Sequence, residues 1–223
     1  MKKPLLYLVL SLGLLPVQAV IAQPMSTPPA TKEELEAVYT TGIETRTIAI
    51  ITKLNLTDDA RSNQVHTIII SQYRALRARD EAIDTKLKGE GLAINYSNRA
   101  PELAASKPLH DKFLSQLNSA LTPDQVNQVE DLMTYNKVTF TYNAYCNIVP
   151  DLSEADKAKV MEYLKQAREE AVDGGSAPEK SAIFQKYKDE INQYLDAHGH
   201  NVEKSMEQWQ ASHTTASITP AGK

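Results

Sequence analysis

The segment spanning residues 56–87 reads "LTDDARSNQVHTIIISQYRALRARDEAIDTKL", and it decides the fold class of the chain. Its apolar residues recur at steps of three and four, the period of a helix that buries one face. Asp58 and Asp59 place negative charge in the first turn, where the helix dipole favours it. We expect a long helix that starts at Thr57 and stops at Gly89, and its buried face comprises Val65, Ile68, Ile69, Gln72, Tyr73 and Leu76.

Helical patterns of the same kind lie on both sides of this segment. Thr31 and Glu34 match a capping box, in which each residue satisfies a backbone N–H of the other, so a helix should begin there. Thr122 followed by Pro123 is typical of a helix start, and so is Ser153. After a loop over residues 89–108, the remaining helices should begin near Leu109, Ser176 and Val202. The prediction is an all-α fold, a single compact domain of about six helices over residues 31–211.

The helical period fails in one place, residues 133–150, which read "MTYNKVTFTYNAYCNIVP". The preceding helix should end near Tyr135, and we expect a short extended interruption near residues 136–142. The side chains that would alternate as in a strand are Val138, Phe140 and Tyr142. An interruption between packed helices exposes backbone polar groups that need partners, and pockets often form at such places. The segment is therefore the best candidate for a site.

The first 22 residues have the pattern of a secretory signal peptide, with Lys2 and Lys3 before an apolar run and small residues at the end. The apolar run is shorter than the ~20 residues of a spanning helix, so membrane insertion is not expected. The predicted location is the periplasm or the medium. Residues 23–30 resemble a linker, and residues 212–223 are expected to be a disordered tail.

Charge and cysteine content narrow the function classes. The formal net charge is −4, and removal of Lys2 and Lys3 with the signal peptide makes it −6. Without a basic cluster, such a chain is a poor partner for nucleic acid or anionic lipid. Cys146 is the only cysteine, so an intramolecular disulfide is excluded. Removing 22 of the 223 residues leaves 201, and a chain of this size buries roughly 70% of its unfolded surface, enough for one core.

Three stretches resemble a known family: "LNLTDDARSNQVHTIIISQYRAL", "LTPDQVNQVEDLMTYNKVTFTYNAYCNIVPDLSEADK" and "FQKYKDEINQYL". Together they are similar to exported bacterial proteins catalogued as domain of unknown function 3826, over most of the chain from Arg46 to Trp209. The resemblance implies a helical exported protein of bacteria that degrade plant and algal polysaccharides. It supplies no established activity. Separately, "LTPDQ" at residues 121–125 resembles a short motif of small periplasmic helical chaperones, which carry two copies of it.

Aromatic and amide side chains suggest a carbohydrate platform, because tyrosine offers an apolar face with a hydroxyl and asparagine offers both a donor and an acceptor. A second cluster on the long helix could add an imidazole, a phenol and a guanidinium. The candidate ligand-binding residues are Tyr135, Tyr142, Asn143, Tyr145, His66, Tyr73 and Arg74. The alternative is structural: tyrosines packed between helices, an interhelical hydrogen bond from His66, and surface ion pairs by Arg74 and Arg77.

Sequence features for catalysis and metal binding are weak. His198, His200 and Glu203 have the composition of a metal site, but Gly199 indicates a helix end and no fourth ligand lies nearby. The pair "EE" at 169–170 indicates a solvated face. No phosphate loop, nucleophile elbow or H-E-x-x-H motif occurs, so we predict no catalytic residue, metal or cofactor.

Three functions follow in order of support. The first is a ligand-binding accessory protein of polysaccharide use, with a glycan or small polar ligand. The second is a chaperone-like helical protein, and the third is a hydrolase or lyase that acts on polysaccharides. The sequence indicates no particular protein partner.

Overall fold

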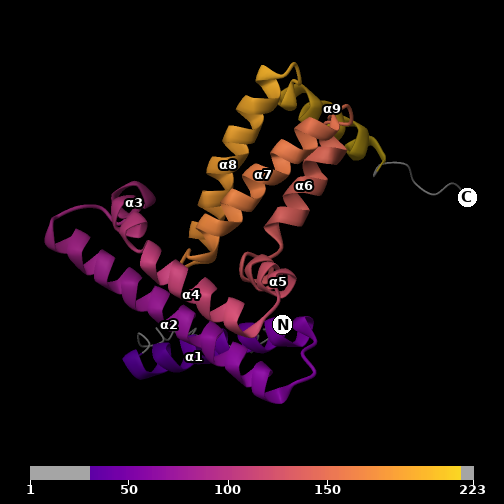
Figure 1. Ribbon diagram of the computed structural model, residues 1–223. Helices are drawn as coiled ribbons and strands as arrows, with labels where there is room; N and C mark the ends of the chain where they lie inside the picture. Colours follow the sequence, from indigo (N-terminus) through magenta and orange to yellow (C-terminus); the bar gives the residue numbers. More distant parts are fainter. Residues whose placement is uncertain (1–30, 217–223) are drawn as a thin grey trace, which may run out of the picture.

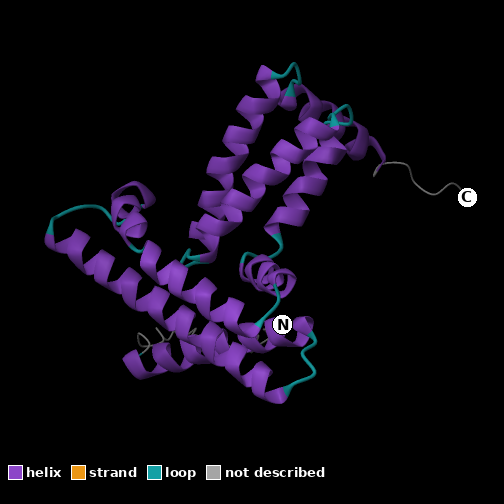
Figure 2. Ribbon diagram, viewed as in Figure 1, coloured by secondary structure: helices purple, strands orange, loops and turns teal. Residues whose placement is uncertain are grey.

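A computed structural model describes residues 31–216, and within them the chain forms nine helices and no strand (Figure 1, Figure 2). The helices are α1 (Lys32–Leu54), α2 (Asp59–Gly89), α3 (Tyr96–Ala105), α4 (Lys107–Ala120), α5 (Pro123–Met133), α6 (Lys137–Ile148), α7 (Glu154–Val172), α8 (Ala177–Ala197) and α9 (Val202–Ala216). The all-α class is confirmed, whereas the expected number of about six helices is too low. No helix in this range is long and apolar enough to cross a bilayer.

The first core lies among α1, α2, α4 and α5, the indigo to magenta part of Figure 1. The long helix α2 packs against α1 on one side and α4 on another. Its predicted stripe is buried, as the helical period requires, except for Tyr73, which is half-buried against the core. The largest fully buried side chains of this core are Val65, Ile69, Phe113, Leu117 and Val129.

The second core lies among α6, α7, α8 and α9, where α6, α7 and α8 run side by side (Figure 1). Its fully buried side chains include Val160, Leu164, Phe184, Ile191 and Leu195. One helix connects the two cores, because Val172 at the end of α7 packs into the first core while Ala167 and Ala171 belong to the second.

Helix starts follow the predicted caps with one exception. Thr31, Thr122 and Ser153 each cap a helix, and all three form reciprocal capping boxes. At α2 the cap is Asp58 and not Thr57, because the Asp58 carboxylate accepts hydrogen bonds from two backbone N–H groups, those of Ala60 and Arg61. A carboxylate also interacts favourably with the positive end of the helix dipole.

The expected extended interruption at residues 136–142 is wrong, because residues 137–142 belong to helix α6 and Asn136 caps it in a left-handed conformation. Only a three-residue turn, 134–136, separates α5 from α6. The alternating residues do not share a face: Val138 is buried, Tyr142 is half-buried and Phe140 is 71% exposed. Burial instead follows the helical period, since Val138 and Tyr145 pack into the second core.

Two further boundaries differ from the prediction. Helix α3 occupies part of the expected loop at 89–108. Pro101 lies inside it and removes one helical hydrogen bond, so helix propensity alone does not predict a helix there. Helix α9 continues to Ala216, into the expected disordered tail. The predicted signal peptide and linker, residues 1–30, and the tail residues 217–223 lie outside the described residues.

Candidate functional site

A cavity of about 450 Å³ lies where the first core meets the α7–α8 turn. Its volume falls in the range of roughly 300–1,000 Å³ typical of small-molecule sites. Helices α1 and α2 form two walls, and the α5–α6 turn and the α7–α8 turn close the others. Its tyrosines and charged side chains are Tyr39, Tyr73, Tyr135, Arg46, Lys53, Arg77, Asp80, Glu81, Asp84 and Lys180.

Three tyrosines from three separate elements line this cavity. The Tyr39 hydroxyl on α1 donates a 2.7 Å hydrogen bond to the backbone carbonyl of Tyr73 on α2. Burial raises the pKa of Tyr73 to about 12, although the positive charge of Arg46 opposes the shift. The Tyr73 hydroxyl makes no hydrogen bond with any residue in the described range. It is therefore a polar group available to a ligand in a mostly enclosed place.

Tyr135 is the third tyrosine, and its backbone is strained. It has φ +61°, and the next residue, Asn136, has φ +54°. A left-handed conformation costs an L-residue roughly 1–2 kcal/mol, and only Gly, Asn and Asp adopt it routinely. Tyr135 is also 44% exposed, so the second core does not require its ring for packing. Strain of this kind concentrates at functional sites, where it fixes a side chain in a required direction.

The α7–α8 turn meets α2 at very short range. A Cβ added to Gly175 would overlap a carboxylate oxygen of Asp80, so any other residue there requires the Asp80 side chain to move. Beside it, the Lys180 ammonium donates to the carbonyls of Ala171 (2.8 Å) and Val172 (3.0 Å), which closes the end of α7. Burial lowers the pKa of Lys180 to about 8. These contacts connect the α7–α8 turn, one wall of the cavity, to α2 and to the end of α7.

Replacing Gly175 with alanine should therefore destabilise the protein. The new methyl group must displace the Asp80 carboxylate from Arg79 and Arg99, and we expect a loss of about 1–3 kcal/mol of unfolding free energy. Urea denaturation followed by circular dichroism measures it. Gly42 is the matched control: it lies inside α1 and its Cβ would meet nothing within 4 Å, so Gly42→Ala should stabilise by up to about 1 kcal/mol. Equal effects at the two positions would contradict the argument.

The structure brings only part of the predicted site together. Tyr73 and Tyr135 line the same cavity, as expected. Tyr142 and Tyr145 do not, because α6 is a helix whose direction carries them towards α7 and α8. The Tyr145 hydroxyl donates to Asn192 Oδ1 at 2.7 Å, which is the structural alternative for this residue. Asn143, on α6, is exposed and lines none of the described cavities.

His66 and Arg74 also point elsewhere. His66 Nε2 lies 2.7 Å from Glu44 Oε2, an interhelical hydrogen bond between α2 and α1. Arg74 pairs with Glu36 at 3.2 Å on the outer side of the same helix pair. The interhelical hydrogen bond expected of His66 and the surface ion pair expected of Arg74 are both present. The residues that line the cavity in their place are Tyr39, Arg46 and Lys53. The sequence placed all three on the first helix but gave no sign of which face meets α2.

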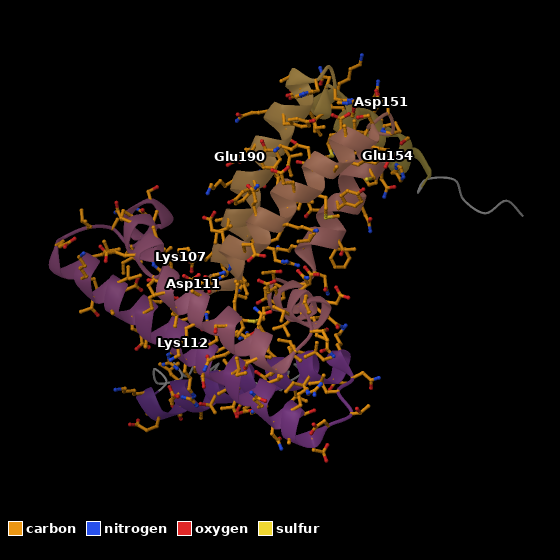
Figure 3. All side chains as sticks on the ribbon, viewed as in Figure 1. Lys107, Asp111, Lys112, Asp151, Glu154 and Glu190 are labelled. Atoms are coloured by element: carbon orange, nitrogen blue, oxygen red, sulfur yellow. The ribbon has the colours of Figure 1, made fainter. Side chains whose placement is uncertain are left out.

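His198 and His200 lie at the end of α8, beside the second core. Helix α8 ends at Ala197, and Gly199 has φ +91°, so it does terminate the helix. His200 lies 3.3 Å from Asp156 and 3.4 Å from Asp151, which Figure 3 labels near the start of α7. Within residues 31–216 no three metal-ligating side chains cluster closely enough to hold an ion.

A second cleft, of about 630 Å³, separates α3 and α4 from α7 and α8. His110 Nδ1 lies 2.8 Å from Asp173 Oδ2, and this pairing, which burial opposes, raises the pKa of His110. Glu169, expected on a solvated face, is half-buried on the cleft wall and pairs with Arg168 at 3.2 Å. Behind it lies the buried Glu130. We call these five residues the polar joint, because they connect α4 and α5 of the first core to α7.

A family model described as a protein of unknown function (DUF3826) matches residues 40–214. The chain belongs to this family. The resemblance found in the three sequence stretches is thus confirmed, and the match includes every residue of the cavity that we use except Tyr39. No curated protein matches the chain. Family membership therefore establishes common descent but assigns no activity. A functional proposal has to rest on the cavity.

Proposed function

We propose that the protein is an exported binding protein that holds a small, polar, ring-bearing ligand in the cavity between α1, α2 and the α7–α8 turn. The observation that carries the proposal is the meeting of three tyrosines from α1, α2 and the α5–α6 turn, one of them held in a left-handed conformation. Tyrosine rings stack on sugar rings through their apolar faces, and their hydroxyls bind sugar hydroxyls. A glycan from polysaccharide breakdown is the class that fits the cavity and the family resemblance.

Binding without turnover is the form of the proposal that the cavity supports. Of the three carboxylates lining it, Asp80 and Glu81 are held by arginines and Asp84 lies 3.5 Å from Arg99. Among the described residues, no histidine lines the cavity. General acid–base catalysis needs a group free to exchange a proton with the ligand. The chaperone-like alternative and the hydrolase or lyase alternative have no observation of their own at this site.

A glycan array followed by calorimetry tests the proposal. Saturable binding of one glycan class, with the glycan recovered intact, is the expected result. Turnover of the bound glycan would favour the hydrolase or lyase. Suppression of client aggregation at stoichiometric amounts, without glycan binding, would favour the chaperone.

Tyr135→Gly should separate binding from stability. Glycine adopts the left-handed conformation without strain, so the unfolding free energy should stay level or rise by up to about 1 kcal/mol. Loss of the ring should weaken glycan binding about tenfold, close to the value of one aromatic contact. Phe140 is an even more exposed aromatic residue, on α6 and outside the cavity, so Phe140→Ala should leave affinity unchanged. Destabilisation by Tyr135→Gly with intact binding would show that the ring is structural.

A further inference from the structure

The charges that line the cavity do not cancel. Three carboxylates face it, and each lies close to an arginine. Asp80 lies 2.7 Å from Arg79 and 2.9 Å from Arg99, and Glu81 lies 2.8 Å from Arg77. The third, Asp84, lies 3.5 Å from Arg99. Each of the three carboxylates thus already has an arginine partner, and Arg99 is shared with Glu179 at 3.4 Å.

The basic side keeps two charges without a partner. Four cationic side chains line the cavity: Arg46, Lys53, Arg77 and Lys180. Arg77 is held between Glu36 and Glu81, and Lys180 is occupied by two backbone carbonyls. In the described part of the chain, the side chains of Arg46 and Lys53 form no ion pair and no hydrogen bond.

Arg46 and Lys53 share one face of α1, because residues seven apart lie two turns from each other. The charge of Arg46 acts on the groups across the cavity, since it opposes the upward pKa shift of Tyr73 and adds to the lowering of the pKa of Lys180. The residues that lead into α8, Gly174–Ala177, line the same cavity, so the positive end of this 21-residue helix lies beside it. The lining side chains that lack an ionic partner in the described range, Arg46, Lys53 and Lys180, therefore all carry a positive charge.

We infer that the cavity selects anionic ligands, ring compounds such as sugars that carry a carboxylate or a sulfate, and that Arg46 and Lys53 bind the anionic group. A guanidinium presents two parallel N–H donors that match a carboxylate or a sulfate, and an ammonium adds a point charge. The inference rests on the proposed function, because it names the ligand class of the same site. It predicts a preference that the tyrosines alone would not produce.

The test compares three trisaccharides by calorimetry: trigalacturonate, a sulfated galactose trimer and the neutral galactose trimer. At least one charged trimer should bind about tenfold or more tightly than the neutral one, the usual margin of a charge-assisted hydrogen bond, and the tighter of the two identifies the anion. Arg46→Gln and Lys53→Gln should each remove most of this margin and leave the neutral trimer within about twofold. Raising the ionic strength should reduce the margin as well.

Lys112→Gln is the matched control, because Lys112 is an exposed lysine on α4 that lines none of the described cavities (Figure 3). It removes the same charge and should not change the preference. Equal binding of charged and neutral trimers overturns the inference and leaves the proposed function standing. A charge preference that survives Arg46→Gln and Lys53→Gln together also overturns it. Binding of none of the trimers or array glycans overturns both proposals.

Discussion

Arg168→Met is expected to lower the unfolding free energy by about 3–5 kcal/mol at pH 8, because it leaves the buried Glu130 carboxylate without a countercharge. The Arg168 side chain is only 6% exposed. Its guanidinium lies 3.2 Å from Glu130 and 3.1 Å from Asp131, and it donates to Asn127 Oδ1 at 2.7 Å. This one side chain thus pairs with two carboxyl groups of α5, that of Glu130 in the polar joint and that of the neighbouring Asp131.

The loss should be smaller at pH 6. Burial raises the pKa of Glu130 from 4.5 to about 7, with Arg168 opposing the shift and Glu169 adding to it. The folded state thus holds the Glu130 proton more tightly than the unfolded state, and the stability that this proton contributes is lost as pH rises from 4.5 through 7. At pH 6 Glu130 is largely neutral, so removal of Arg168 costs less than at pH 8.

Urea denaturation at both pH values measures the effect, and two further variants make it decisive. Arg74→Met is the control, since Arg74 is 49% exposed and its surface pair with Glu36 should be worth only about 0–1 kcal/mol. Adding Glu130→Gln to Arg168→Met should recover part of the loss at pH 8, because it removes the unpaired charge. If Arg74→Met and Arg168→Met lower the unfolding free energy by similar amounts, or if the double variant recovers nothing, the polar joint contributes no more to stability than a surface ion pair.

Phe113→Ala should also cost about 3–5 kcal/mol, the usual range for removing a buried aromatic ring. Phe113 is 1% exposed in the first core, whereas Trp209, the only tryptophan, lies on α9 beside the second core. Because α7 contributes to both cores, we expect them to unfold together. Trp209 fluorescence and far-ultraviolet circular dichroism should therefore show the same shifted midpoint.

Phe184→Ala, in the second core, is the matched variant and should shift both signals to the same extent. If Phe113→Ala moves the circular dichroism transition and leaves the Trp209 transition in place, the two cores are separate folding units. The predicted single domain over residues 31–211 would then be wrong.

The all-α fold could be predicted from local sequence because its signals are local. Capping boxes at Thr31, Thr122 and Ser153 and the stripe on α2 each act within a few residues of the chain. The errors came where two local signals compete. Pro101 argued against a helix at residues 96–105, where α3 forms. The alternating β-branched residues around Phe140 favoured a strand, but this segment forms helix α6, which packs against α7.

The site was less predictable because it depends on contacts between distant segments. Tyr135 could be selected because the helical period breaks beside it, and Tyr73 because it lies on the stripe of α2. Arg46 could not, since its role follows from which carboxylates other arginines already hold. Gly175 and Asp80, which approach closely in the fold, are nearly a hundred positions apart in the sequence, so no local pattern predicts their contact.

The position of the cavity has a practical consequence for finding its occupant. Its walls come from α1 and α2 in the first core and from the turn that leads into α8 of the second. A molecule that touches all of them makes contacts that exist only in the folded chain, so by mass action it raises the melting temperature. At a hundred times its dissociation constant, such an occupant adds about 2.7 kcal/mol, which a thermal-shift screen of crude glycan fractions would detect before any ligand is purified.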